Sequence, residues 1–200
     1  MVRLFGACGL ALAVLSTCAR AQVIEFESNG LKYQTLTRSG VTVMFAPLPS
    51  HVHEYAIIQV AVSNGSPGPY VIRPEDFTFV RSDGVTRRGA PARSVISMLM
   101  QKGSGSDVVK LVTTYEASIY GNQHLKSTNG YEQRRQAALS MGSTRLKAAA
   151  AASSVALVQT KLAPGQSTDG AVFFPAGGKP LGPGRVVVRT SSDLFEFKTD

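Results

Sequence analysis

Two histidines that lie close together are the residues of this chain with the clearest chemical potential. His51 and His53 are separated by Val52, and Glu54 follows them. On an extended strand, side chains two residues apart point to the same face, and two imidazoles on one face can bind Cu or Zn. A closed structural site needs four ligands. The third histidine, His124, lies in a distant polar loop, so this site would have to recruit carboxylates or that residue.

Patterns typical of enzymes are absent or incomplete. Ile57 occupies the position where a zinc-protease helix beginning at His53 would need its second histidine. The chain contains no Gly-x-Ser-x-Gly elbow and no Ser-x-x-Lys motif, and three histidines offer few bases for a serine triad. Gly103-Ser104-Gly105 lacks the third glycine of a dinucleotide fingerprint. We therefore expect no enzyme activity, no catalytic residues and no cofactor.

Two other clusters favour structural roles. Glu75-Asp76 is a carboxylate pair, but such pairs are common, and this one precedes a predicted strand. Met98-Leu99-Met100 could be a stripe of soft metal ligands in an oxidising compartment. These residues follow Val95 and Ile96 at helical spacing, so we interpret them as apolar packing.

The N-terminus has the features of a cleavable signal peptide over residues 1–21. Arg3 gives a positive start, residues 4–18 carry no charge, and Ala19-Arg20-Ala21 fits the small-x-small pattern that signal peptidase reads. About fifteen uncharged residues are too few to span a bilayer, which needs about twenty. We therefore expect an exported protein that starts at Gln22, is periplasmic or extracellular, and has no transmembrane helix in its mature chain.

Both cysteines lie within this leader. Cleavage after Ala21 would remove Cys8 and Cys18, and with them any disulfide, cysteine nucleophile or thiolate metal site. An alternative is a lipid anchor at Cys18, since Leu15-Ser16-Thr17-Cys18 is similar to a bacterial lipoprotein box with threonine in place of Gly, Ala or Ser. Residues 22–200 are enough to build one substantial core, and we expect a single domain.

Basic residues are concentrated in the middle of the chain. The whole chain has a net charge of +8, from 21 Lys and Arg against 13 Asp and Glu. Residues 81–161 contain twelve basic and four acidic side chains, whereas the rest of the mature chain contains seven and nine. Such a segment can attract an anionic surface or an acidic envelope protein, or it can be a solvated helical face. Export and the lack of tryptophan disfavour nucleic acid as the partner.

Residue periodicity predicts strands on both sides of a helical segment. Runs rich in Val, Ile, Phe, Tyr and Thr predict strands from 22 to 88, with a hairpin turn at Ser39-Gly40. Residues 54–62 are apolar on nearly both faces, which predicts a central strand. Asp107 is predicted to cap a helix, and Gly142 to bend one. The predicted helices cover 91–102, 107–121 and 131–156, and the last predicted strands cover 171–174, 185–190 and 194–197.

A set of turn and core motifs runs through the predicted strands. These motifs are the apolar strand ending at Asn64, Pro74-Glu75-Asp76-Phe77 with Asp83-Gly84, and Leu162-Ala163-Pro164-Gly165 followed by residues 170–174. Over residues 55–197 the chain thereby resembles exported bacterial immunoglobulin-like domains of unknown function. The resemblance implies a mainly β fold, an immunoglobulin-like β-sandwich with an inserted helical segment at about residues 92–156. It implies no catalytic residue, because fold alone does not carry an activity.

Together these features predict a non-enzymatic extracytoplasmic module for binding or assembly. The helical segment would provide the contact surface, and the β-sandwich would hold it in place. The basic excess between residues 81 and 161 is the observation behind this hypothesis. A second hypothesis is a Cu- or Zn-handling protein that uses His51 and His53, and a third is a hydrolase with an unrecognised site.

Overall fold

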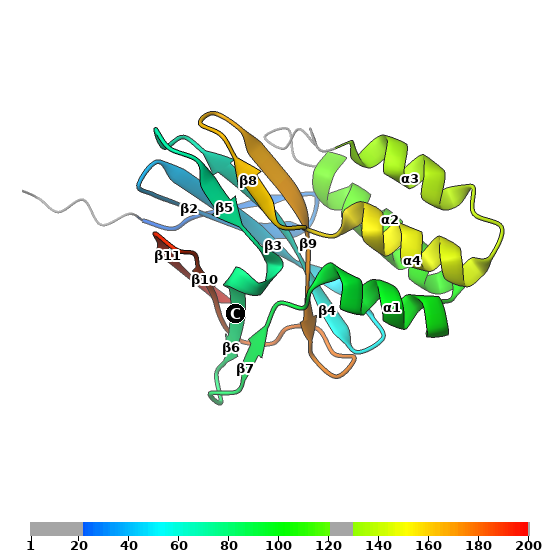
Figure 1. Cartoon of the computed structure of the whole chain (residues 1–200). Coiled ribbons are helices and arrows are strands. Elements are labelled where there is room, and N and C mark those ends of the chain that lie inside the picture. Colours follow the sequence, from blue (N-terminus) through cyan, green and yellow to red (C-terminus); the bar gives the residue numbers. More distant parts are fainter. Residues whose placement is uncertain (1–21, 121–129, 200) are drawn as a thin grey trace, which may run out of the picture.

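The computed structural model describes residues 22–120 and 130–199, and this part of the chain is mainly β (Figure 1). The predicted signal peptide with Cys8 and Cys18, and His124, lie outside the described residues. Three antiparallel sheets and four α-helices are present. The strands are β1 (Ile24–Ser28), β2 (Leu31–Arg38), β3 (Val41–Val52), β4 (Tyr55–Asn64), β5 (Tyr70–Ile72), β6 (Phe77–Arg81), β7 (Thr86–Arg88), β8 (Thr160–Leu162), β9 (Ser167–Pro175), β10 (Gly184–Arg189) and β11 (Leu194–Thr199). The helices are α1 (Ala92–Lys102), α2 (Gly105–Tyr120), α3 (Tyr131–Leu139) and α4 (Thr144–Val155), with a 3-10 turn at Pro74–Asp76.

A five-stranded sheet in the order β1-β2-β3-β4-β9 forms the centre of the fold. β4 lies between β3 and β9 and is buried on both faces, which confirms the central strand predicted over residues 54–62. Along β4, Ile58 faces the smaller sheets, whereas Ile57 faces the helices. Ser39 and Gly40 form the predicted turn between β2 and β3, with φ of 49° and 80°. Two consecutive positive φ values are typical of the two-residue turns that match strand twist.

The other strands cover one face of this sheet. The four-stranded sheet β11-β10-β6-β7 and the pair β5-β8 pack against it around a core rich in phenylalanine. Phe45 of β3 and Phe197 of β11 meet edge to face across this core, with ring centroids 5.0 Å apart. β5 and β8 were not predicted as strands, because three residues are too few to show a period of two.

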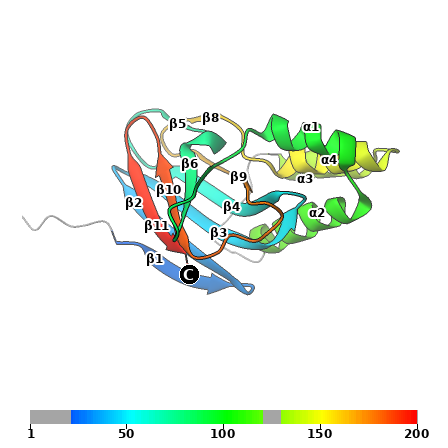
Figure 2. The same ribbon diagram turned by 90° about the horizontal axis from the view of Figure 1, so that it is seen from below.

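The helices cover the opposite face of the five-stranded sheet (Figure 2). They are inserted between β7 and β8, as predicted, and share a core with the sheet that includes Tyr33, Ile57 and Phe173. α4 lies against α1, α2 and α3, and its alanine run has no long side chains to prevent this close approach. A Cβ added at Gly103 would lie 2.8 Å from the Cβ of Ala148, so glycine is required where α1 ends beside α4.

The predicted helix over 131–156 is two helices, which corrects the expectation of one helix bent at Gly142. α3 ends at Leu139, and α4 begins at Thr144 with Ser143 at its N-cap position. The exposed link contains serine and glycine, which form helices poorly and favour helix ends. No helix in residues 22–120 or 130–199 is long and apolar enough to cross a membrane.

The two ends of the molecule are formed by different parts of the chain. The described chain starts at the end of the sheets that is remote from α1 and α4 (Figures 1 and 2). The opposite end consists of the last turn of α1, the start of α2 and the link between α3 and α4. We call this end, residues 100–106 and 140–147, the helical tip.

Candidate functional site

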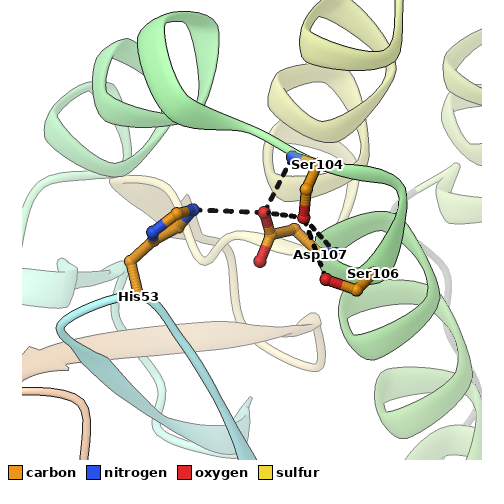
Figure 3. Close-up of polar contacts among 4 residues, drawn as sticks. All are labelled: His53, Ser104, Ser106 and Asp107. Atoms are coloured by element: carbon orange, nitrogen blue, oxygen red, sulfur yellow. Dashed lines mark hydrogen bonds and ion pairs between the residues drawn. The ribbon is translucent and has the colours of Figure 1, made fainter.

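His53 does not continue the strand that contains His51, which corrects the prediction that both side chains share one strand face. β3 ends at Val52, and His53 is the first residue of a two-residue turn into β4, with φ of 48°. Its Nε2 lies 3.1 Å from Oδ2 of Asp107 in α2 (Figure 3). His53 therefore joins the turn between β3 and β4 to the start of α2.

Asp107 belongs to a capping box at the start of α2. The backbone N–H of Ser104 donates to Oδ2 of Asp107 at 2.8 Å, and the backbone N–H of Asp107 donates to Oγ of Ser104 at 3.3 Å. This reciprocal pair satisfies two N–H groups that the first turn of a helix leaves without partners. Asp107 thus helps to cap the helix, as predicted, but from the third helical position, because Ser104 occupies the N-cap.

The cluster in Figure 3 contains the side chains of a serine triad without its connectivity. Oγ of Ser104 donates to Oδ2 of Asp107 at 2.7 Å, and His53 contacts the same oxygen. In a triad, histidine lies between serine and carboxylate and accepts the serine proton. Here the carboxylate lies in the middle, so His53 cannot act as the base for Ser104, and the geometry supports a structural role.

The geometry around the two histidines provides few metal ligands. Within residues 22–120 and 130–199, no group of three or more His, Cys, Asp or Glu side chains could hold a metal ion. In the part of the chain that the structure describes, the carboxylate paired with His53 is that of Asp107. Metal binding by His51 and His53 stays a prediction, and a further ligand would have to come from elsewhere.

The sequence predicts structural roles for two clusters, the carboxylate pair Glu75-Asp76 and the stripe Met98-Leu99-Met100. Both lie in capping or packed positions, with one exception. Oδ2 of Asp76 accepts a hydrogen bond from the backbone N–H of Arg73 at 2.9 Å, which closes the 3-10 turn, and burial raises the pKa of Asp76. Leu99 is fully buried, and Met98 packs against the core between helices and sheet. Met100 is the exception, because 51% of it is exposed at the helical tip.

A buried polar network joins α2 and α3 to the central sheet. The hydroxyl of Tyr115 donates to Oδ2 of Asp169 on β9 at 2.6 Å, and the Tyr115 ring packs on Tyr131 with centroids 5.1 Å apart. The hydroxyl of Tyr131 donates to Glu116 at 3.3 Å, and Glu116 also pairs with Arg135. Burial and the charge of Asp169 raise the pKa of Tyr115 well above its usual value, so Tyr115 remains a donor. Sequence reasoning missed this contact, because Tyr115 and Asp169 are 54 positions apart.

The helical tip carries basic side chains that have no acidic partner. Lys102 at the end of α1, and Arg145 and Lys147 in the first turn of α4, form no ion pair within the described residues. Asp107 is the acid nearest to the tip in sequence, but its side chain is only 5% exposed and is held by His53. The tip therefore presents a net positive charge to solvent.

Apolar side chains are exposed on the same tip. Met100, Met141 and Leu146 are exposed to 51%, 40% and 45%. They account for three of the seven large hydrophobic residues that are exposed in the described chain. Single exposed apolar residues are ordinary, but several beside unpaired cations are typical of a contact surface.

Comparison with known proteins gives no match to this chain among family models, curated proteins or solved structures. The resemblance to exported immunoglobulin-like domains therefore stays a prediction from the sequence motifs.

Proposed function

We propose that this chain is a non-enzymatic, exported binding module whose helical tip contacts an anionic surface of the cell envelope. The observation that carries the proposal is the set of unpaired cations, Lys102, Arg145 and Lys147, beside exposed methionine and leucine side chains. Cations attract anionic headgroups over about a Debye length, and apolar side chains then insert at the boundary between headgroups and acyl chains.

The arrangement of acids supports an anionic partner. Asp107 is buried against His53, and Glu116 is paired with Arg135, so neither carboxylate neutralises the tip. An acidic ligand would therefore meet unopposed positive charge. Charge complementarity of this kind mainly increases the rate and selectivity of association.

The packing of the helices supports their role as a rigid platform. α4 is enclosed by α1, α2 and α3, and Tyr115 fixes α2 to Asp169 of the central sheet. A contact surface on a rigid scaffold loses little conformational entropy when it binds. The central sheet can thus hold the tip in one orientation.

We also propose that the β-part is immunoglobulin-like, and the strand order supports this fold. The order β3-β4-β9 corresponds to strands A, B and E of such a sandwich, and β11-β10-β6-β7 corresponds to G, F, C and C′. The hairpin β1-β2 extends the first sheet beyond strand A, and the helices occupy the connection between C′ and E. Where antibody domains have a disulfide between strands B and F and a tryptophan on strand C, the buried core here contains Ile58 of β4, Val186 of β10 and Phe79 of β6.

Binding to vesicles tests the proposed function. The mature protein is mixed with vesicles of phosphatidylcholine, with and without phosphatidylglycerol, and bound protein is measured after sedimentation. The test variant is the triple charge reversal of Lys102, Arg145 and Lys147 to glutamate. The control is the double reversal of Arg185 and Lys198, which lie opposite each other on β10 and β11.

We expect binding only to vesicles with phosphatidylglycerol. Each cation near an anionic surface contributes about 1 kcal/mol, so loss of three contacts weakens binding on the order of 100-fold. The control variant should bind within a few fold of the unmodified protein. Weakening of both variants in proportion to the charge changed, six units in the test variant against four in the control, would show a response to net charge alone, and the tip would then not be the contact surface.

A further inference from the structure

We infer that Met100 and Met141 are oxidation sites, and that their conversion to methionine sulfoxide releases the helical tip from an anionic membrane. This inference rests on the function proposed above and assigns a chemical control to the same surface. The oxidant is hydrogen peroxide or another two-electron oxidant that donates an oxygen atom. Methionine sulfoxide reductases reverse the change, so it can act as a switch.

Methionine is the only residue type that carries sulfur in the mature chain. Both cysteines, Cys8 and Cys18, lie in the predicted leader, and the chain has no tryptophan. Residues 22–200 therefore contain no thiol that would consume an oxidant first. They contain four methionines, and the structure describes all of them: Met44, Met98, Met100 and Met141.

The fold divides these methionines into two pairs. Met44 of β3 and Met98 of α1, the core methionines, are partly buried and pack against the core between the helices and the central sheet. Met100 and Met141, the tip methionines, are 51% and 40% exposed and lie at the helical tip. An oxidant in solution must reach the sulfur atom, so the tip methionines should react first.

Oxidation removes a property that the proposed contact needs. The sulfur lone pair attacks one peroxide oxygen, and an S–O bond forms as the O–O bond breaks. The other oxygen leaves as hydroxide and takes up the remaining proton to become water. The sulfur is oxidised by two electrons, the peroxide is reduced, and the side chain becomes a polar sulfoxide. Insertion of a polar group among acyl chains is unfavourable.

The composition of the tip makes it sensitive to this change. Two of its three exposed apolar side chains are methionines, and Leu146 is the third. Oxidation leaves the charges of the basic residues at the tip unchanged, but it removes most of the apolar surface beside them. The tip would still attract an anionic membrane, but it would no longer insert there.

Peroxide treatment followed by mass mapping and vesicle sedimentation tests this inference. The mature protein is exposed to hydrogen peroxide for increasing times, and the sulfoxide fraction of each methionine is measured. Each sample is then mixed with vesicles of phosphatidylcholine and phosphatidylglycerol. The test variant, Met100→Leu with Met141→Leu, keeps an apolar tip that peroxide does not oxidise. The matched control, Met44→Leu with Met98→Leu, keeps both tip methionines, and both variants exchange side chains of similar volume.

We expect the tip methionines to be oxidised several times faster than the core methionines. Oxidation of both should weaken vesicle binding by the unmodified protein and by the control variant about tenfold or more. Treatment with the two methionine sulfoxide reductases, one for each sulfoxide epimer, should restore it. The test variant should bind as the untreated protein does, both before and after peroxide.

Three results would overturn the inference: equal oxidation rates for the two pairs, unchanged binding after oxidation of the tip, or an equal loss of binding in the test variant. If the untreated protein did not bind these vesicles, the proposed function itself would be rejected, and control by oxidation with it. The untreated and oxidised samples are measured side by side, so the two failures are distinguishable.

Discussion

Removal of the Tyr115 hydroxyl is the most informative test of how the helices are fixed to the sheet. Tyr115 is 1% exposed and Asp169 is 7% exposed, and the two oxygens are 2.6 Å apart. A hydrogen bond to a charged group contributes about 1.5–3 kcal/mol, and this one is shielded from water. Tyr115→Phe should therefore lower the free energy of unfolding by about 2 kcal/mol, which corresponds to a fall in Tm of about 4–8 °C for a chain of this length.

The matched control for this prediction is Tyr55→Phe. Tyr55 packs edge to face on Phe173 with centroids 6.4 Å apart, and its hydroxyl has no hydrogen-bond partner within the described residues. Removal of this hydroxyl keeps the ring contact, so the change in stability should stay within about 0.5 kcal/mol. Both variants therefore lose one oxygen atom, but only one of them loses a buried hydrogen bond.

Urea denaturation followed by circular dichroism measures both variants. The midpoint should shift for Tyr115→Phe at constant slope, because the surface exposed on unfolding does not change. A double-mutant cycle with Asp169→Ala should give a coupling energy above about 1 kcal/mol. Equal midpoints for the Tyr115 and Tyr55 variants, or a coupling energy near zero, would refute the claim that this contact anchors the helices.

Four further changes have outcomes that follow from the structure. Ser104→Ala removes the N-cap of α2 and should destabilise the protein by about 1 kcal/mol in the same urea assay. Gln59→Met should stabilise it by about 1 kcal/mol, since Gln59 is fully buried and its Oε1 has no hydrogen-bond partner in the described part of the chain. Burial raises the pKa of Tyr70 to about 12, so the stability that its neutral form contributes should be present below pH 10 and fall between pH 10 and 12. Tyr70→Phe should make this fall smaller in an alkaline unfolding series, and the rest of the fall comes from other buried tyrosines such as Tyr115, whose pKa is also raised. Zinc or copper should change the Tm of the unmodified protein and of its His51→Ala, His53→Ala variant by the same amount, because the side chains of His51 and His53 do not share a strand face. A Tm shift that is lost in the variant would instead support the metal site.

The regular elements could be predicted from the sequence because their signals are local. β4 is apolar on both faces, and this pattern predicts the central place in a sheet that β4 takes between β3 and β9. The turn at Ser39-Gly40 has residues that accept positive φ between two alternating runs. The spacing of Val95 and Leu99 placed α1, and both side chains are fully buried. In each case the residues that predict the element lie close together in the sequence.

The contacts of the candidate sites could not be predicted, since they depend on residues far apart in the chain. His53 was assigned to a strand, and only its positive φ turns the side chain toward Asp107. The helical tip brings Lys102 close to the start of α4 through the packing of Gly103 on Ala148.

The start of the described chain and the helical tip lie at opposite ends of the molecule, and this separation determines how the protein can meet a membrane. A lipid at Cys18 would leave residues 19–23 as the spacer before β1, a reach of about 18 Å at full extension. A folded chain of this size has a radius of gyration of about 16 Å and is about 40 Å across. A lipid-anchored form that stands upright on this short spacer would direct its tip away from the membrane that holds it, toward a second envelope layer, whereas a freely exported form can lay the tip on the nearest bilayer in any orientation. The same fold would serve as a spacer between two surfaces in one case and as a peripheral membrane protein in the other.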